Sequence, residues 1–133
     1  MLVVDASCLF EVVADGVAAE EVRGHLAADQ EQAAPHLIDA EVLSVIRRHH
    51  FGGLLDPTAA RQAVEDLRDW PGDRVGHRPL LDRAWELRDR IRPWDALYVA
   101  LAEAFGATLL TLDRRLARVE GLGCVVVVPA EAT

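Results

Sequence analysis

The chain has 133 residues, 51% of them hydrophobic and 27% charged, which is typical of one globular domain. All 14 basic residues are arginine, so mechanisms that need a lysine, such as a Walker-type phosphate loop or a Schiff base, are excluded. The formal net charge of -8 argues against nucleic-acid binding through a broad basic surface, but leaves open a nuclease whose acids surround a metal. The sequence has no run that approaches a membrane span, and Cys8 and Cys124 lack metal-ligand spacing, so we expect a cytoplasmic protein with reduced thiols.

The first half of the chain alternates short apolar runs with amphipathic ones. The predicted elements are strands at 2–4 and around 33–34, and helices over 8–14, 17–28, 38–51 and 56–70. Asp5 ends the first strand, and Val17 contributes to the apolar face of the second helix. Asp39 is a plausible cap of the third helix, and Pro57 suits the start of the fourth. Glu41 is therefore expected in a first helical turn.

The second half continues the alternation. The predicted elements are a strand over 74–77, a helix over 80–91, a helix over 94–105, a strand over 108–111, a helical turn over 114–119 and a strand over 125–128. Gly106 is the expected helix end, and the four consecutive valines from Val125 indicate a strand covered on both faces. The chain is thus predicted to be one α/β domain over 1–133, with a short, mainly parallel sheet between helices.

Four acids stand at the junctions of these elements. Asp5 and Asp113 each follow a predicted strand, whereas Glu41 and Asp95 lie in first helical turns. In a parallel α/β sheet, the carboxyl ends of the strands and the amino ends of the helices gather at one edge. The four carboxylates are therefore expected to share one site.

Such a cluster of carboxylates is suited to a hard divalent cation. Oxygen ligands favour Mg2+ or Mn2+, and two such ions about 4 Å apart can assist an in-line displacement at phosphorus. Ser7 and Thr111, each two residues from an acid, are candidates to orient a carboxylate or a water molecule. Each acid also has a purely structural explanation, because carboxylates favour helix amino ends, cap turns and close loops.

Several motifs resemble a known family. They are VVDAS at 3–7, the early-helix Glu41, PWDALYVALAEAFGATLLTLDRRL at 93–116 and VVVVP at 125–129. Together they resemble the PIN-domain ribonucleases, specifically the toxins of bacterial VapBC toxin–antitoxin pairs. Ser44, where relatives often have asparagine, and Leu116, where many have an aromatic residue, depart from the pattern without removing an acid.

The resemblance implies a PIN-like three-layer α/β/α sandwich and endonucleolytic cleavage of RNA by metal-activated water. It implies that Asp5, Glu41, Asp95 and Asp113 are the catalytic, Mg2+-binding residues, with Ser7 and Thr111 as polar neighbours. It also implies a homodimer and a cognate VapB-type antitoxin that fills the active-site groove. Candidate contacts for substrate or antitoxin are Arg114, Arg115, Arg118 and Trp94.

Two other readings remain open. An aspartyl-phosphate phosphatase would ordinarily need a second acid two residues after Asp5, where this chain has Ser7. A PIN scaffold without catalytic activity would serve as a binding module, and the presence of all four acids argues against it. Cleavage of RNA, or detection of a phosphorylated Asp5, would discriminate between these readings.

Overall fold

A computed structural model describes residues 1–130 of the chain, so the last three residues of the predicted domain lie outside it. The strands are β1 (Leu2–Val4), β2 (Gln32–Pro35), β3 (Asp73–Val75), β4 (Thr108–Leu110) and β5 (Val126–Val127). The α-helices are α1 (Ala6–Val13), α2 (Ala19–Ala28), α3 (Leu37–Phe51), α4 (Pro57–Asp69), α5 (Leu81–Glu86) and α6 (Pro93–Phe105). Two short 3-10 helices are η1 (Arg78–Leu80) and η2 (Leu116–Arg118).

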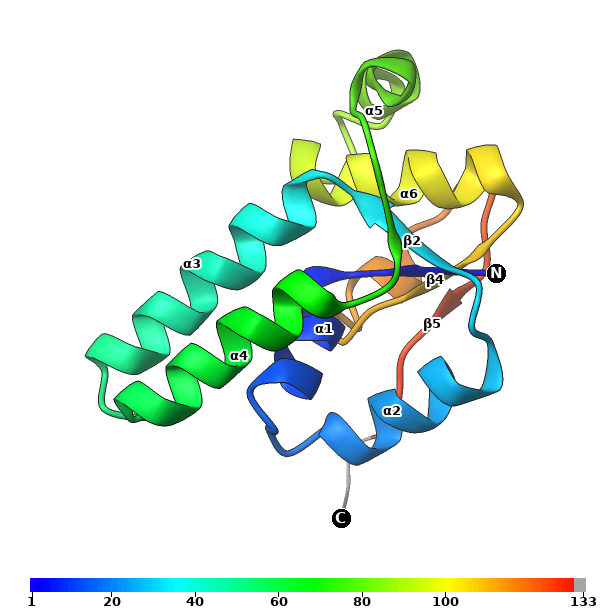
Figure 1. Cartoon of the computed structure of the whole chain (residues 1–133). Coiled ribbons are helices and arrows are strands. Elements are labelled where there is room, and N and C mark those ends of the chain that lie inside the picture. The colour runs from blue at the N-terminus through cyan, green and yellow to red at the C-terminus, as the bar shows by residue number, and fades with distance from the viewer. Residues whose placement is uncertain (131–133) are drawn as a thin grey trace.

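The strands form one parallel sheet in the order β3-β2-β1-β4-β5. The direction of the strand order reverses between β1 and β4, so the carboxyl ends of these two strands flank the crevice where α/β proteins bind ligands. Helices α5 and α6 lie on one side of the sheet, and α1 and α2 lie on the other (Figure 1). The predicted three-layer α/β/α architecture is confirmed.

The most apolar stretch forms α6 and β4, as predicted. Pro93 occupies the first turn of α6, where its fixed φ and missing N–H cost nothing. Gly106 ends the helix at φ 60°, a left-handed conformation that a residue without Cβ adopts most easily. Helix α6 packs between α5 and strands β1, β2 and β4, which explains why nearly all its faces are apolar. Within residues 1–130, no helix is long and apolar enough to cross a membrane.

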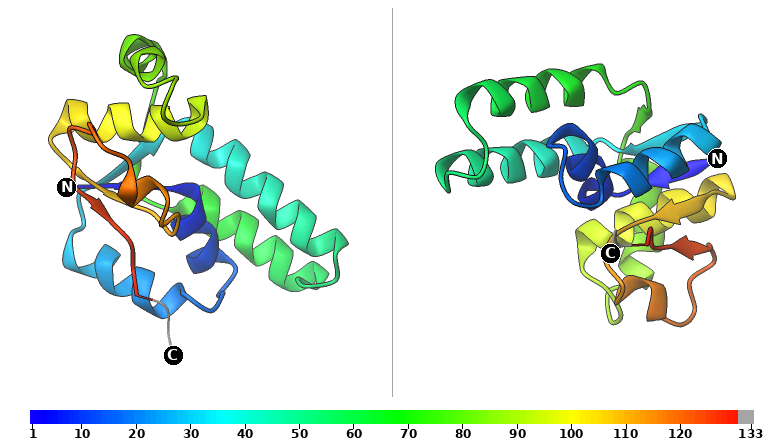
Figure 2. Two further views of the ribbon diagram at one scale, coloured as in Figure 1. Left: turned by 180° about the vertical axis from the view of Figure 1, so that it is seen from behind. Right: turned by 90° about the horizontal axis from the view of Figure 1, so that it is seen from below.

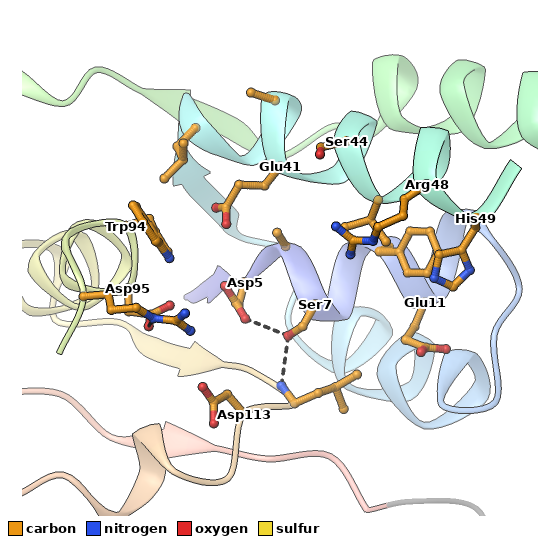
Figure 3. A pocket seen from close by; sticks show the side chains of 17 residues that line it. Asp5, Ser7, Glu11, Glu41, Ser44, Arg48, His49, Trp94, Asp95 and Asp113 are labelled. Atoms are coloured by element: carbon orange, nitrogen blue, oxygen red, sulfur yellow. Dashed lines mark hydrogen bonds and ion pairs between the residues drawn. The ribbon is translucent and has the colours of Figure 1, made fainter. Parts of the chain in front are cut away.

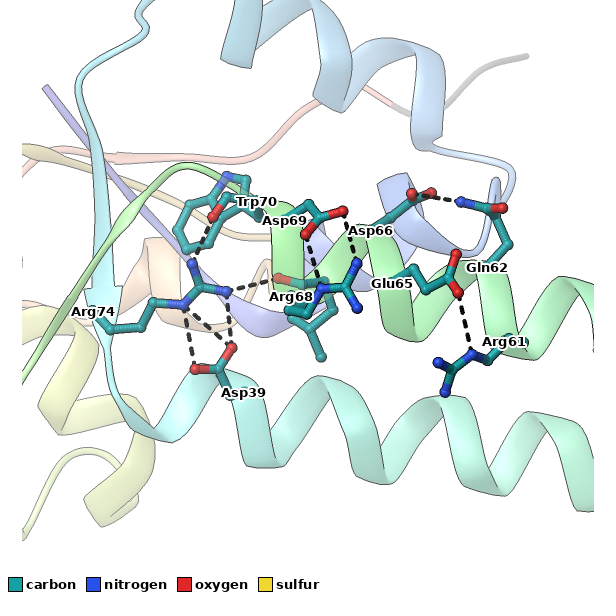
Figure 4. Close-up of polar contacts among 10 residues, drawn as sticks. Asp39, Arg61, Gln62, Glu65, Asp66, Arg68, Asp69, Trp70 and Arg74 are labelled. Atoms are coloured by element: carbon teal, nitrogen blue, oxygen red, sulfur yellow. Dashed lines mark hydrogen bonds and ion pairs between the residues drawn. The ribbon is translucent and has the colours of Figure 1, made fainter.

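Helices α3 and α4 form an antiparallel hairpin that extends beyond the sheet (Figures 1 and 2). Asp56 caps α4, because its carboxylate accepts a hydrogen bond of 2.7 Å from the backbone N–H of Ala59. At the other end of the hairpin, the guanidinium of Arg74 donates to Asp39 on α3 and to the carbonyl of Leu67 on α4 (Figure 4). One side chain of β3 therefore ties both helices to the sheet.

The start of α3 differs from the prediction. Asp39 is not the cap, because its carboxylate is turned toward Arg74. The helix begins at Leu37, one residue before the predicted start, and the backbone N–H of Leu37 donates to Nε2 of His77 at 3.0 Å. A distant histidine thus satisfies a backbone donor that sequence spacing assigned to a local acid. Because of this earlier start, Glu41 is the fifth residue of the helix and lies in its second turn, not in the first turn as predicted.

Three further predictions about elements were wrong in part. The helix expected over 80–91 ends at Glu86, and the following residues form turns before α6. Strand β5 contains only Val126–Val127 at the edge of the sheet, and Val125 is 66% exposed, so the valines are not covered on both faces. Val17 precedes α2 and is 88% exposed, so it contributes nothing to an apolar helix face.

Candidate active site

An open cleft of about 840 Å³ lies at the carboxyl edge of the sheet, and all four predicted acids line it (Figure 3). Asp5 follows β1, Glu41 lies on α3, Asp95 lies in the first turn of α6, and Asp113 follows β4. The parallel sheet brings together four segments that are far apart in the sequence, because their strands or helices meet at this edge.

Asp5 is held by two hydroxyl groups. Oδ2 of Asp5 accepts hydrogen bonds from Ser7 Oγ at 2.6 Å and from Thr111 Oγ1 at 2.8 Å. The same hydroxyls accept backbone N–H groups, that of Leu112 for Ser7 and that of Asp113 for Thr111. These hydrogen bonds join the segment after β4, which carries Asp113, to the segment after β1, which carries Asp5. The orienting role predicted for Ser7 and Thr111 therefore has a geometric counterpart.

Glu41 has a partner that the sequence reasoning missed. The hydroxyl of Tyr98, a buried residue of α6, donates to Oε1 of Glu41 at 2.8 Å. Burial and the negative charge of Glu41 raise the pKa of Tyr98 far above its usual value, so the phenol stays a donor. Burial, with smaller contributions from Asp5 and Asp95, raises the pKa of Glu41, and the Tyr98 hydrogen bond opposes this increase.

Asp95 and Asp113 each face an arginine. Nε of Arg92 lies 3.6 Å from Oδ2 of Asp95, and Nε of Arg115 lies 3.3 Å from Oδ1 of Asp113. Burial and the charge of Asp5 raise the pKa of Asp95 despite Arg92. Burial also opposes ionisation of Asp113, but hydrogen bonds from Arg115 outweigh it and hold its pKa below the usual value. The negative charge of Asp113 is therefore better compensated by its arginine than the negative charge of Asp95 is.

The chemistry of this cleft fits a hard divalent cation. Four carboxylates offer only oxygen ligands, and the raised pKa values of Glu41 and Asp95 arise in part from the neighbouring negative charges, which a cation would offset. Within residues 1–130, no three His, Cys, Asp or Glu side chains already form a group that could hold a metal ion. Binding would therefore need some carboxylates to turn from their present partners toward a shared centre.

Comparison with known proteins decides the family. A family model described as PIN domain matches residues 2–122. The chain belongs to the PIN-domain family. Ribonuclease VapC3 of Mycobacterium tuberculosis H37Rv is 44% identical to this PIN domain over 118 residues, which cover 88% of this chain and 85% of that protein. Ribonuclease VapC1 of the same strain is 40% identical over 124 residues, or 92% of each chain.

Solved structures agree with the fold of this PIN domain. A toxin–antitoxin complex from Klebsiella pneumoniae has a TM-score of 0.69 at 20% identity, with 99% of this chain and 100% of that chain covered. VapBC2 from Rickettsia felis, bound to a DNA fragment from its promoter, has a TM-score of 0.68 at 14% identity, with coverage of 97% and 98%. At these identities, the likeness shows the fold alone. The PIN-like fold expected from the motifs is confirmed.

Of the residues predicted to contact substrate or antitoxin, only Trp94 lines the cleft of this PIN domain. Trp94 is 46% exposed and lines the cleft, whereas Arg115 is engaged with Asp113. Arg114 and Arg118 are exposed and do not line the cleft. Sequence reasoning also passed over Tyr98 and Arg92 as site residues. The tyrosine, the only one in the chain, could have been recognised because it lies one helical turn after Asp95.

Replacing Thr111 by valine should weaken the site without removing an acid. The side chain of Thr111 is fully buried, and valine keeps its shape but neither donates to Asp5 nor accepts from the N–H of Asp113. We expect RNA cleavage to fall about 10–100-fold, as for other residues that orient ligands. Thr111→Ser, which keeps the hydroxyl, is the matched control and should stay within a few-fold of wild type. Equal activity of the two variants would contradict the orienting role.

Replacing Glu41 by glutamine should stabilise the metal-free protein at neutral pH. The folded-state pKa of Glu41 lies above its ordinary value of 4.5, so ionisation disfavours the folded state. This cost is absent below the unfolded-state pKa, appears as the pH rises past it, and is complete above the folded-state pKa. In chelator we therefore expect the variant to unfold at a higher temperature than wild type at pH 7, and the difference to disappear near about pH 3.

Metal should reduce or reverse this difference in unfolding temperature, because Glu41 is a candidate ligand. Added Mn2+ should raise the unfolding temperature of the wild type more than that of Glu41→Gln, since a ligand stabilises the state that binds it. Thermal unfolding followed by circular dichroism, in chelator and in Mn2+ at both pH values, tests both statements. A variant that is less stable than wild type in chelator at pH 7 would contradict the statement that ionisation of Glu41 disfavours the folded state.

Proposed function

We propose that this PIN domain is a metal-dependent endoribonuclease and the toxin of a type II toxin–antitoxin pair. The observation that carries the proposal is the meeting of Asp5, Glu41, Asp95 and Asp113 in one open cleft. The names of the relatives, Ribonuclease VapC3 and Ribonuclease VapC1, support an activity on RNA. The cofactor that suits the carboxylates is Mg2+, with Mn2+ as an alternative.

The four carboxylates would hold the cation, and each has a local reason for its position. Asp5 is fixed by hydroxyls, and Glu41 is fixed by Tyr98. Asp95 and Asp113 pair with the exposed arginines Arg92 and Arg115. These two carboxylates can therefore turn most easily toward a bound cation. When bound, such a cation neutralises developing charge on the phosphate and lowers the pKa of water.

The reaction proposed is hydrolysis by in-line displacement. The oxygen of water bonds to phosphorus, the bond from phosphorus to the 3' oxygen breaks, and a proton passes to that oxygen. The products are a 5'-phosphate and a 3'-hydroxyl. Arg92 and Arg115 are 61% and 79% exposed, so their remaining N–H groups can contact the phosphate, and Trp94 presents an exposed ring at the edge of the cleft.

The test is incubation of purified protein with structured RNAs in Mn2+ or in chelator, followed by mapping of the product ends. We expect internal cuts in Mn2+, no cuts in chelator, and 5'-phosphate ends. Cuts that persist in chelator, or that leave 3'-phosphate or cyclic ends, would contradict a metal-dependent hydrolysis of this kind. No cleavage of any RNA in Mn2+ would favour the binding-module alternative.

We also propose a VapB-type antitoxin as partner and a homodimer as the assembly. The structural neighbours include a toxin–antitoxin complex and VapBC2, which supports a partner of this kind. The acidic cleft is open and large enough, at about 840 Å³, to accept a side chain or short segment of another protein. Co-purification with the product of an adjacent gene, together with loss of RNA cleavage in the complex, is the expected result.

A further inference from the structure

A second cavity, of about 600 Å³, adjoins the cleft and is rich in arginine. The connection from α5 to α6 and the segment around η2 form it, and we call it the arginine pocket. Its charged lining residues are Arg88, Asp89, Arg90, Arg92, Asp95, Asp113 and Arg115. Arg92, Asp95 and Asp113 line the active-site cleft as well, so the two cavities adjoin at these three residues. Four of the 14 arginines in a chain of net charge -8 therefore gather beside the candidate active site.

The arginines of this pocket are of two kinds. Arg92 and Arg115 face Asp95 and Asp113, so their charge is largely offset. Arg88 and Arg90 instead donate to backbone carbonyls, those of Trp85 and Glu120, at 2.9 Å each. In the part of the chain that the structure describes, no carboxylate forms an ion pair with either of them.

A carbonyl acceptor orients a guanidinium without neutralising it. The group of Arg88 also lies 4.6 Å above the ring of Trp85, which further restricts its position. Each guanidinium has five N–H donors, so most remain available to an anion. Asp89 is the other acid in the pocket besides the two shared with the cleft, and both arginines are exposed. These properties indicate a site for phosphate groups rather than an internal ion-pair network.

We propose that Arg88 and Arg90 bind backbone phosphates of a single RNA strand next to the bond that is cut. This inference rests on the proposed function, since it takes the acids as the place of the scissile phosphate. A strand centred there carries further phosphates on both sides, and the arginine pocket adjoins the cleft at Asp95 and Asp113. The shared acids favour RNA over an acidic protein segment, because the negative charge of Asp95 and Asp113 would repel such a segment.

The experiment measures RNA affinity in chelator, where no cleavage occurs, by fluorescence anisotropy of a labelled single-stranded RNA across a series of salt concentrations. The variant is Arg88→Gln combined with Arg90→Gln, because glutamine keeps a donor for the carbonyls of Trp85 and Glu120. The control is Arg61→Gln, which removes an exposed arginine that pairs with Glu65 on α4 and lines neither cavity. Circular dichroism checks that each variant is folded.

We expect the double variant to bind roughly 10-fold more weakly near physiological salt, and the slope of log affinity against log salt to fall by about 0.7 for each arginine removed. The control should keep the wild-type slope. An unchanged slope for the double variant would overturn the inference. The same measurement is made with a labelled polyglutamate peptide, and the inference is also overturned if the double variant loses binding of this peptide but binds RNA as the wild type does.

Cleavage assays in Mn2+ separate this inference from the proposed function. If the wild type cuts RNA but the double variant shows the same salt slope and the same KM, the arginine pocket is not an RNA site and the nuclease assignment stands. If the wild type binds RNA through Arg88 and Arg90 but cuts nothing, the proposed activity fails and the phosphate site stands.

Discussion

Asp95→Asn is expected to lower RNA cleavage in Mn2+ by roughly 10²–10³-fold, because it removes one of the negative charges that would hold the cation. The side chain is 22% exposed and projects from the first turn of α6 into the cleft. Asparagine keeps its shape, and loss of the charge relieves the repulsion from Asp5 that helps raise the pKa of Asp95. The fold should therefore be intact, or slightly more stable in chelator.

Asp82→Asn is the matched control. Asp82 is also an acid in the first turn of a helix, α5, but it is exposed and lines neither the cleft nor the arginine pocket. Both substitutions remove the same favourable interaction with a helix amino end, so a difference in cleavage isolates the role of the cleft. Wild-type cleavage by Asp95→Asn would remove the nuclease assignment from this site.

Arg74→Ala is expected to lower the free energy of unfolding by about 2–4 kcal/mol, since it leaves several partly buried acceptors without a donor. The Arg74 side chain is 21% exposed. It donates to both oxygens of Asp39 and to the carbonyls of Leu67, Trp70 and Gly72, and its guanidinium lies 4.9 Å over the ring of Trp70 (Figure 4). These contacts hold α3, which carries Glu41, against α4 and β3.

Arg68→Ala is the comparison for this stability measurement, because Arg68 lies on α4 but forms an exposed ion pair with Asp69. It should change the free energy of unfolding far less than Arg74→Ala does, because exposed ion pairs contribute little to stability. Arg74→Lys, which keeps the charge but loses the planar fork, should behave more like Arg74→Ala than like wild type. Urea denaturation at pH 7 distinguishes these expectations. Equal losses of unfolding free energy for Arg68→Ala and Arg74→Ala would contradict the role of Arg74 in holding α3 against α4 and β3.

The candidate site could be predicted from the sequence because its acids occupy positions that local patterns define. A buried run followed by an acid predicts a carboxylate at a strand end, as for Asp5 and Asp113, and an acid after a proline predicts a first helical turn, as for Asp95. Where these ends meet depends on all strands being parallel, which the alternation of strands and helices already indicates. The PIN motifs supplied the same residues independently.

Other features depend on partners that are distant in sequence. The cap of α3 comes from His77 rather than from Asp39, and Glu41 is fixed by Tyr98 on another helix. No local spacing encodes either contact. Of the valines from Val125, only Val126–Val127 form a strand, which lies at the edge of the sheet and pairs with β4 alone.

The sequence by itself determined the α/β class, the positions of most strands and helices, and the identity of the four acids, since periodicity and chain punctuation act over a few residues. Only the tertiary structure decided that Tyr98 holds Glu41 and which arginines beside the acids have no carboxylate partner within residues 1–130. Ion pairs and hydrogen bonds form across elements whose separation in the chain carries no information about their distance in space. For that reason Arg88 and Arg90, unremarkable in the sequence, become candidate phosphate contacts once the chain is folded.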